Sequence, residues 1–154
     1  MPNISGLRSP NAKVGRLVYF GRMLDKIRLH AAGRLPPEYI ANLGDAAEPT
    51  VFDARCCRFL GVKHADLAQR VLAGAADAEV LAWAEAHGRP RTDEECEIWN
   101  FFMCKRGWRD AAADRLKMRI AQGRLEGQPI LTMFDFLDYD EGRESAAERP
   151  WEKV

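Results

Sequence analysis

Between positions 17 and 31, apolar residues recur at alternating intervals of three and four: Leu17, Phe20, Leu24, Ile27 and Ala31. This is the spacing of one face of an amphipathic helix that packs on a core. Gly33 offers a left-handed stop, and the proline pair at 36–37 prevents the helix from continuing. The pattern predicts a helix around which the rest of the chain is organised.

The polar positions of this helix lie on its other face: Arg16, Arg22, Asp25, Lys26 and His30. Asp25 is three residues from both Arg22 and Arg28, within reach of either on a helix surface. The simpler interpretation is a solvated face with ordinary ion pairs. The alternative is the wall of a polar pocket, where Arg22, Arg28 or His30 faces an anionic ligand.

Further short helices follow from caps and breakers. Ser9 and Pro10 predict a short helix that Gly15 interrupts. Later helices are predicted, in chain order, over residues 38–43, 54–60, 64–73, 78–87, 93–106, 109–121 and 129–137. Asp53 is the expected cap of the second of these, and Thr92 with Glu95 forms a capping box before the fifth. Apolar residues expected to face inward include Leu72, Ile98, Trp99, Phe102 and Met103.

No run of alternating β-branched residues predicts a strand. We therefore expect an all-α fold: one compact domain over residues 7–143 with about seven or eight short helices, too unequal for a regular four-helix bundle. Residues 144–154 form a charged tail that Trp151 could dock.

Composition narrows the function. The chain has 154 residues, with 23 Lys plus Arg and 23 Asp plus Glu, so its formal net charge is zero. This balance argues against nucleic acid or anionic membrane as a partner. There is neither an apolar run long enough for a membrane span nor a secretory signal. The four cysteines lack CxxC spacing and are expected to be reduced, in a cytoplasmic protein.

Three groups of residues could carry chemistry. Cys56 and Cys57 lie between Arg55 and Arg58, where a thiolate is favoured, although small buried thiols are the commoner case. The segment 105–110 places Arg106 and Arg109 beside Trp108, which suits recognition of a carboxylate or phosphate but also fits core tryptophan with solvated charges.

The third group is acidic: Asp135, Asp138, Asp140 and Glu141. Its spacing does not match a calcium loop, and surface acids at a helix end are the simpler interpretation. No two of the three histidines have metal-ligand spacing, so no metal site is predicted, and the sequence identifies no cofactor. His30 is the histidine best suited to act as a general base.

Several motifs together resemble a known family. They are LRSP, GRMLDKIRLHAAG, CCRFLGV, WNFFMCKRGWRD and FDFLDYDEGR, within residues 7–143. The sequence resembles a family of small bacterial proteins known only as a domain of unknown function. The resemblance implies a single cytoplasmic bacterial domain and carries no activity, ligand or catalytic residue to transfer.

Two functions remain open. The first is a small-molecule binder or enzyme with an interhelical polar pocket for an anionic ligand. Its ligand-binding candidates are Arg28, Tyr39, Asn42, Asp53, Arg58, Arg106 and Arg109. Its catalytic candidates are His30 and Asp25 for proton transfer, and Cys56 if the chemistry is covalent. The alternative is a helical protein–protein interaction module, homodimeric and without catalysis, that uses exposed aromatic residues such as Tyr19, Trp83 or Trp151.

Overall fold

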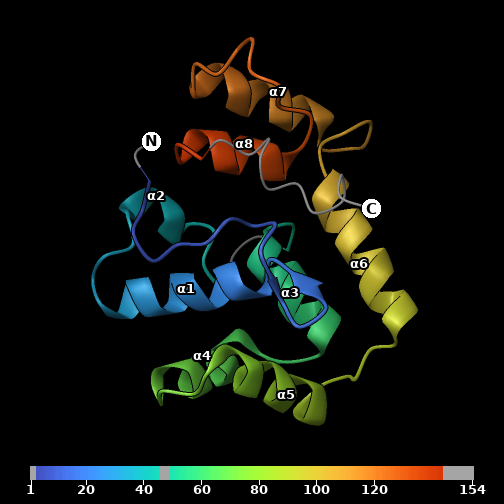
Figure 1. The fold of residues 1–154 in the computed structure, drawn as a ribbon. Helices are drawn as coiled ribbons and strands as arrows, with labels where there is room; N and C mark the ends of the chain where they lie inside the picture. The colour runs from blue at the N-terminus through green and yellow to red at the C-terminus, as the bar shows by residue number, and fades with distance from the viewer. Residues whose placement is uncertain (1–2, 46–48, 144–154) are drawn as a thin grey trace.

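Helix α1 (Phe20–Ala31) lies in the middle of the fold, between the α4–α5 pair and the α7–α8 pair (Figure 1). The computed structural model describes residues 3–45 and 49–143. Every residue of α1 from Phe20 to Ile27 is buried, because other elements pack around the whole circumference of its first two turns. A helix surrounded in this way has no solvated face over these turns, so the charged residues there are buried as well.

The other described elements follow a simple order. A two-stranded antiparallel ribbon, β1 (Lys13–Val14) and β2 (Leu17–Val18), precedes α1, with Val14 paired to Leu17. The remaining helices are α2 (Pro37–Ile40), α3 (Phe52–Leu60), α4 (His64–Leu72), α5 (Asp77–His87), α6 (Asp93–Lys105), α7 (Ala113–Gln122) and α8 (Met133–Asp140). The predicted all-α class is therefore confirmed, with the small ribbon as the one strand pair in the part of the chain described.

The main core joins α1 to most of the other helices. Its fully buried members include Phe20, Met23, Leu24, Leu67, Val80, Met103 and Phe134. A smaller apolar cluster of Leu116, Ile130 and Phe136 holds α7 against α8. The α7–α8 pair thus has its own contacts and packs on the rest through Phe134.

The segment before α1 differs from the prediction. No helix follows Ser9 and Pro10; the Ser9 hydroxyl accepts a hydrogen bond from the Asn11 amide (3.1 Å), which makes a turn. Gly15 has φ of +55° and reverses the chain between the two strands. Leu17 is consequently a strand residue, and the helix begins at Phe20 rather than three residues earlier.

The predicted solvated face of α1 is also wrong in part. Arg22, Asp25 and Lys26 are buried, and only His30 of that face within the helix is exposed. Their burial is possible because each charged group meets an opposite charge from a distant segment.

Some helix ends are set by side-chain hydrogen bonds or by a glycine within a few residues of the end. Thr92 Oγ1 accepts from the Glu95 amide (3.1 Å) while Glu95 Oε2 accepts from the Thr92 amide (2.9 Å), so the predicted capping box is confirmed. Gly61 ends α3 in the left-handed conformation. Asp53, in contrast, is not the cap of α3: the helix starts at Phe52, and the Asp53 carboxylate turns into the protein.

Three predicted inward residues face solvent instead. Leu72, Ile98 and Phe102 are 56%, 61% and 40% exposed. On α6 the buried side is formed by Cys96, Trp99 and Met103, so the outer side of this helix keeps exposed apolar residues. The charged groups of Arg55 and Arg106 lie over the Phe102 ring.

Helices α7 and α8 start later than predicted. The Asp110 carboxylate accepts hydrogen bonds from the amides of Gly107 and Ala112, which holds a turn where the helix was expected to begin. Thr132 Oγ1 accepts from the Asp135 amide (3.1 Å) and so fixes the start of α8.

Candidate functional site

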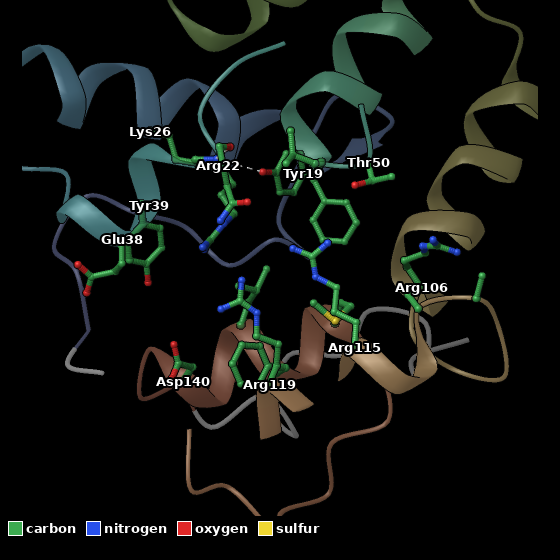
Figure 2. A pocket seen from close by; sticks show the side chains of 18 residues that line it. Tyr19, Arg22, Lys26, Glu38, Tyr39, Thr50, Arg106, Arg115, Arg119 and Asp140 are labelled. Carbon is green, nitrogen blue, oxygen red and sulfur yellow. Dashed lines mark hydrogen bonds between the residues drawn. The ribbon is translucent and has the colours of Figure 1, made fainter. Parts of the chain in front are cut away.

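A cavity of about 460 Å³ lies between α1, α2 and the start of α3 on one side and α7 and α8 on the other (Figure 2). Its volume is in the range of small-molecule sites. The residues that line it range from Tyr19 to Asp140 along the chain, so the site exists only in the folded protein. Its lining combines buried ion pairs, unpaired arginines and aromatic rings.

The first buried ion pair at the cavity joins α1 to α3. Lys26 Nζ donates to Asp53 Oδ1 (2.9 Å) and to the backbone oxygen of Asn42 (2.6 Å). The Tyr19 hydroxyl donates to the same Asp53 oxygen (2.6 Å), and the Gly44 amide donates to the other (2.9 Å). Burial lowers the pKa of Lys26, with the charge of Asp53 opposing, and raises the pKa of Tyr19 well above its ordinary value.

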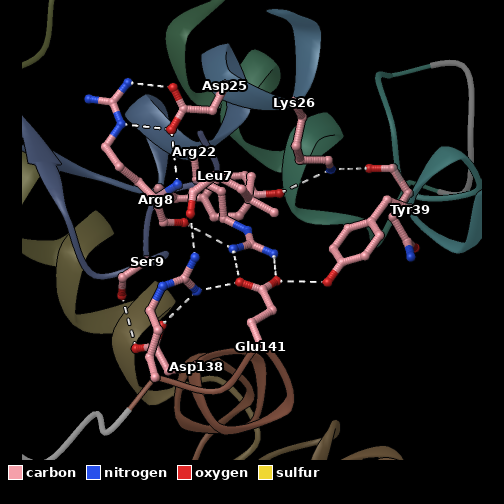
Figure 3. Close-up of polar contacts among 12 residues, drawn as sticks. Leu7, Arg8, Ser9, Arg22, Asp25, Lys26, Tyr39, Asp138 and Glu141 are labelled. Atoms are coloured by element: carbon pink, nitrogen blue, oxygen red, sulfur yellow. Dashed lines mark hydrogen bonds and ion pairs between the residues drawn. The ribbon is translucent and has the colours of Figure 1, made fainter. Parts of the chain in front are cut away.

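The second buried ion pair joins α1 to the end of α8 (Figure 3). Arg22 binds Glu141 through both terminal nitrogens, and the Tyr39 hydroxyl donates to Glu141 Oε1 (3.0 Å). Arg143 also donates to Glu141. Burial alone would raise the pKa of Glu141, but Arg22 and Arg143 outweigh it and the net shift is downward. Both cations at this wall of the cavity, Arg22 and Lys26, thus have carboxylate partners.

The opposite wall is different. Arg115 and Arg119 lie one turn apart on α7, and their guanidinium groups point from that helix toward Tyr19 and Arg22 (Figure 2). Within residues 3–45 and 49–143, neither makes a hydrogen bond or an ion pair. Arg119 is close enough to Asp140 that its positive charge lowers the pKa of that carboxyl, against the larger opposite effect of burial. Arg106, at the end of α6, also lines the cavity and pairs with Asp110 at 3.4 Å.

Apolar side chains complete the lining. Phe52 packs edge-on against Tyr19, with ring centroids 5.4 Å apart, and Met133, Phe136 and Leu137 line the α8 side. Arginine forks beside apolar and aromatic walls suit a ligand that has both an anionic group and an apolar part.

Some of the residues predicted to bind a ligand lie at this cavity. Tyr39, Asn42 and Arg106 line the cavity, and Asp53 lies behind its wall as the partner of Lys26 and Tyr19. The other three binding candidates lie elsewhere. Arg28 bridges Asp25 and Asp77, Arg58 is exposed and donates to the Pro49 oxygen, and Arg109 lies over Trp108.

The catalytic candidates do not line this cavity. Asp25 accepts two hydrogen bonds from the Arg8 guanidinium, each 2.8 Å, in a network that ties the N-terminal segment to α1 (Figure 3). His30 is exposed near the end of α1. Cys56 is fully buried, and burial raises its pKa well above the ordinary value, which disfavours the thiolate.

The aromatic residues predicted to form an exposed interaction surface differ in their exposure. Tyr19 is 3% exposed and belongs to the core, so its expected exposure is wrong. Trp83 is half-buried and stacks on His87. Trp151 and the rest of the 144–154 tail lie outside the described residues, as do positions 46–48 of the predicted linker.

The acidic side chains in and after α8 bind different partners and do not form one cluster. Asp138 accepts from Ser9 and Asn11, Glu141 pairs with Arg22, and Asp135 accepts from the Thr132 amide. Among the residues described, no group of three or more His, Cys, Asp and Glu side chains is arranged to hold a metal ion. None of the described helices has the length and apolar character of a membrane span.

Sequence reasoning missed most of the cavity. Tyr19, Arg115 and Arg119 were not singled out as ligand-binding residues, and Arg22 and Lys26 were assigned to a solvated face or a generic pocket wall. One signal was present: Arg22 with Lys26, and Arg115 with Arg119, are like charges at i,i+4, an unfavourable spacing on a helix unless something offsets it.

Comparison with known proteins gives one finding. A family model described as a domain of unknown function (DUF5069) matches residues 4–143. The resemblance inferred from the sequence motifs is thereby confirmed. No curated protein matches the chain.

Proposed function

The chain belongs to the DUF5069 family, a domain of unknown function, and from the geometry of its cavity we propose that it binds a small anionic molecule that also carries an apolar group. The observation that carries the proposal is the pair Arg115 and Arg119, which point into the cavity and make no hydrogen bond or ion pair with the described residues, with Asp140 near Arg119 as the one carboxylate whose pKa registers the charge of either. A guanidinium held beside a partly apolar cavity gains most when it meets a carboxylate or phosphate there.

The other wall supports the same proposal. Lys26 and Arg22 are already neutralised by Asp53 and Glu141, so they fix the shape of the cavity rather than adding free positive charge. The Tyr39 hydroxyl and the Asn42 region offer polar contacts at the rim. Phe52, Met133 and Phe136 would then cover the apolar part of the ligand.

Binding is better supported than catalysis. The groups proposed for proton transfer and covalent chemistry, His30, Asp25 and Cys56, are absent from the cavity lining. The four cysteines are free thiols, which supports a reducing compartment such as the cytoplasm as the place where the protein works.

The test is ligand binding by calorimetry and thermal shift. The probes are phenyl phosphate and benzoate, which combine an anion with a ring, and benzyl alcohol, which lacks the charge. We expect the two anions to raise the melting temperature and the alcohol to have little effect, because a ligand that binds only the folded state stabilises it.

Variants assign the effect to the cavity. Arg115→Gln and Arg119→Gln should each weaken binding by roughly tenfold or more, the value of one lost charged contact. Lys117→Gln is the matched control, because Lys117 is on the same helix with its side chain 80% exposed, and it should bind like the parent protein. Equal binding by all three variants, or no binding of either anion, would refute the proposal.

A further inference from the structure

The outer side of α6 (Asp93–Lys105) carries large apolar side chains that the described part of the protein leaves exposed. Ile98 is 61% exposed and Phe101 is 51% exposed. Phe102, Trp108 and Leu131 widen this surface, at 40%, 46% and 59%. Figure 1 shows α6 along one edge of the fold, with its other side against the rest of the molecule. Phe101, Trp108 and Leu131 also line one hollow beside α6, and large exposed apolar patches mark interaction sites.

The residues along the middle of this surface have a definite order. Glu94, Ile98, Phe101 and Lys105 follow one another at intervals of four, three and four residues, the spacing of a coiled-coil seam. The stripe therefore runs acid, apolar, apolar, base from the start of the helix to its end. All four residues are exposed.

We propose that this stripe is the contact between two copies of the chain, with the two α6 helices packed antiparallel about a two-fold axis. When the stripe is placed against a reversed copy of itself, Ile98 faces Phe101 of the second copy. Glu94 then faces Lys105 of the second copy, and the same two contacts recur by symmetry. A two-fold interface requires this self-complementarity.

Charge selects this arrangement over its alternatives. A parallel pairing would place Glu94 against Glu94 and Lys105 against Lys105, which is unfavourable. Neither residue has an ion-pair partner in residues 3–45 and 49–143; Lys105 Nζ lies 5.4 Å from the centroid of the Phe101 ring. Both charges are therefore available to a second copy.

The two proposals use different surfaces. Arg115 and Arg119 of the cavity are on α7, and no residue of the stripe lines that cavity. The dimer can therefore be tested without a ligand, and its failure would leave the anion-binding proposal unaffected.

The experiment is a charge exchange followed by sedimentation velocity on the full chain. We expect a dimer for the parent protein. Glu94→Lys places a lysine opposite Lys105 of the second copy, and Lys105→Glu places a glutamate opposite Glu94, so each should weaken the dimer by roughly tenfold or more. The double variant restores both pairs in reversed sense and should dimerise again.

Mixing the two single variants is the sharper measurement. One protomer then has lysine at both positions and the other has glutamate at both, so the mixture should form a heterodimer although each variant alone is largely monomeric. Lys117→Glu and Glu126→Lys repeat the same charge changes at exposed positions outside the stripe and should leave the dimer intact.

Loss of helix stability is distinguishable from loss of pairing. Both single substitutions oppose the α6 dipole, and the double variant opposes it twice, so an effect through helix stability would be greatest in the double variant. Recovery of the dimer there supports the proposal. A parent protein that stays monomeric, single variants that dimerise like the parent, or a double variant that stays monomeric would overturn it.

Discussion

Arg22 and Glu141 form an ion pair through both guanidinium nitrogens although they are 119 residues apart in the chain, and their side chains are 2% and 0% exposed. The pair fastens the end of α8 to the central helix and fixes one wall of the cavity. Tyr39 and Arg143 donate hydrogen bonds to the same carboxylate, so both oxygens of Glu141 accept hydrogen bonds from more than one donor.

The first prediction concerns a substitution that removes the charge of Glu141. Glu141→Gln keeps the size of the side chain but leaves the buried Arg22 without an anion. The free energy of unfolding should fall by about 3–5 kcal/mol, the range for one lost partner of a buried pair. Urea denaturation at pH 7 measures it. Glu38→Gln, an exposed acid at the rim of the cavity, is the control; an equal effect of both variants would show that the pair contributes little.

The second prediction concerns pH. The folded pKa of Glu141 is below its ordinary value of 4.5, so folding favours its ionised form. Its stabilising contribution is thus fully present above pH 4.5 and is lost as the pH falls through the lowered folded pKa.

The difference in unfolding free energy between the parent and Glu141→Gln reports this contribution, because the raised pKa of Asp138 affects both proteins. The pKa of Asp140 is raised mainly by burial, which both proteins share, and less by the charge of Glu141, which the variant removes. We expect the difference to be constant between pH 5 and 7 and to shrink below pH 4.5. A difference that does not change with pH would contradict the assignment.

The fold was largely predictable because its helix boundaries are set by local chemistry. Gly61, Gly107 and the Thr92–Glu95 box act within a few residues of themselves, and all three end or start helices as expected. The segment before α1 was not predictable in this way. The turn at Ser9 is held in part by Asp138, 129 residues away, and a local pattern contains no information about that contact.

The cavity was predictable only in outline. Its polar character followed from the density of arginines, and Tyr39, Asn42 and Arg106, three of the predicted ligand-binding residues, line it. Arg22 and Lys26 looked solvated because their partners, Glu141 and Asp53, are supplied by other helices. Arg115 and Arg119 could not be assigned to the cavity from the sequence, because α7 faces the cavity only after it has packed on α8.

The third prediction tests the capping box of α6. Thr92→Ala removes the oxygen that accepts from the Glu95 amide, and should lower the free energy of unfolding by about 1 kcal/mol. Thr92→Ser retains that oxygen and should behave nearly like the parent. Thermal unfolding followed by circular dichroism compares the three proteins. If serine destabilises as much as alanine, the threonine methyl group rather than the cap is responsible.

The last prediction concerns the thiols, and with them any covalent chemistry. Burial raises the pKa of Cys56 well above its ordinary value, that of Cys57 to about 12 and that of Cys104 to about 11. Very little thiolate is therefore present at neutral pH, and the thiolate is the reactive form. We expect iodoacetamide to label the native protein slowly at pH 7.5, beginning at Cys104, which is only partly buried, and to label all four cysteines rapidly in urea.

Mass spectrometry of peptides gives the rate at each cysteine, and N-acetylcysteine supplies the rate of a free thiol. Local opening of α3 would also allow labelling, but that rate should increase when Glu141→Gln destabilises the fold, whereas the rate of an activated thiol would not. Labelling of Cys56 as fast as the free thiol, and unchanged in that variant, would show that it is an activated nucleophile. The covalent chemistry considered for this residue would then have to be placed at α3 and not in the cavity.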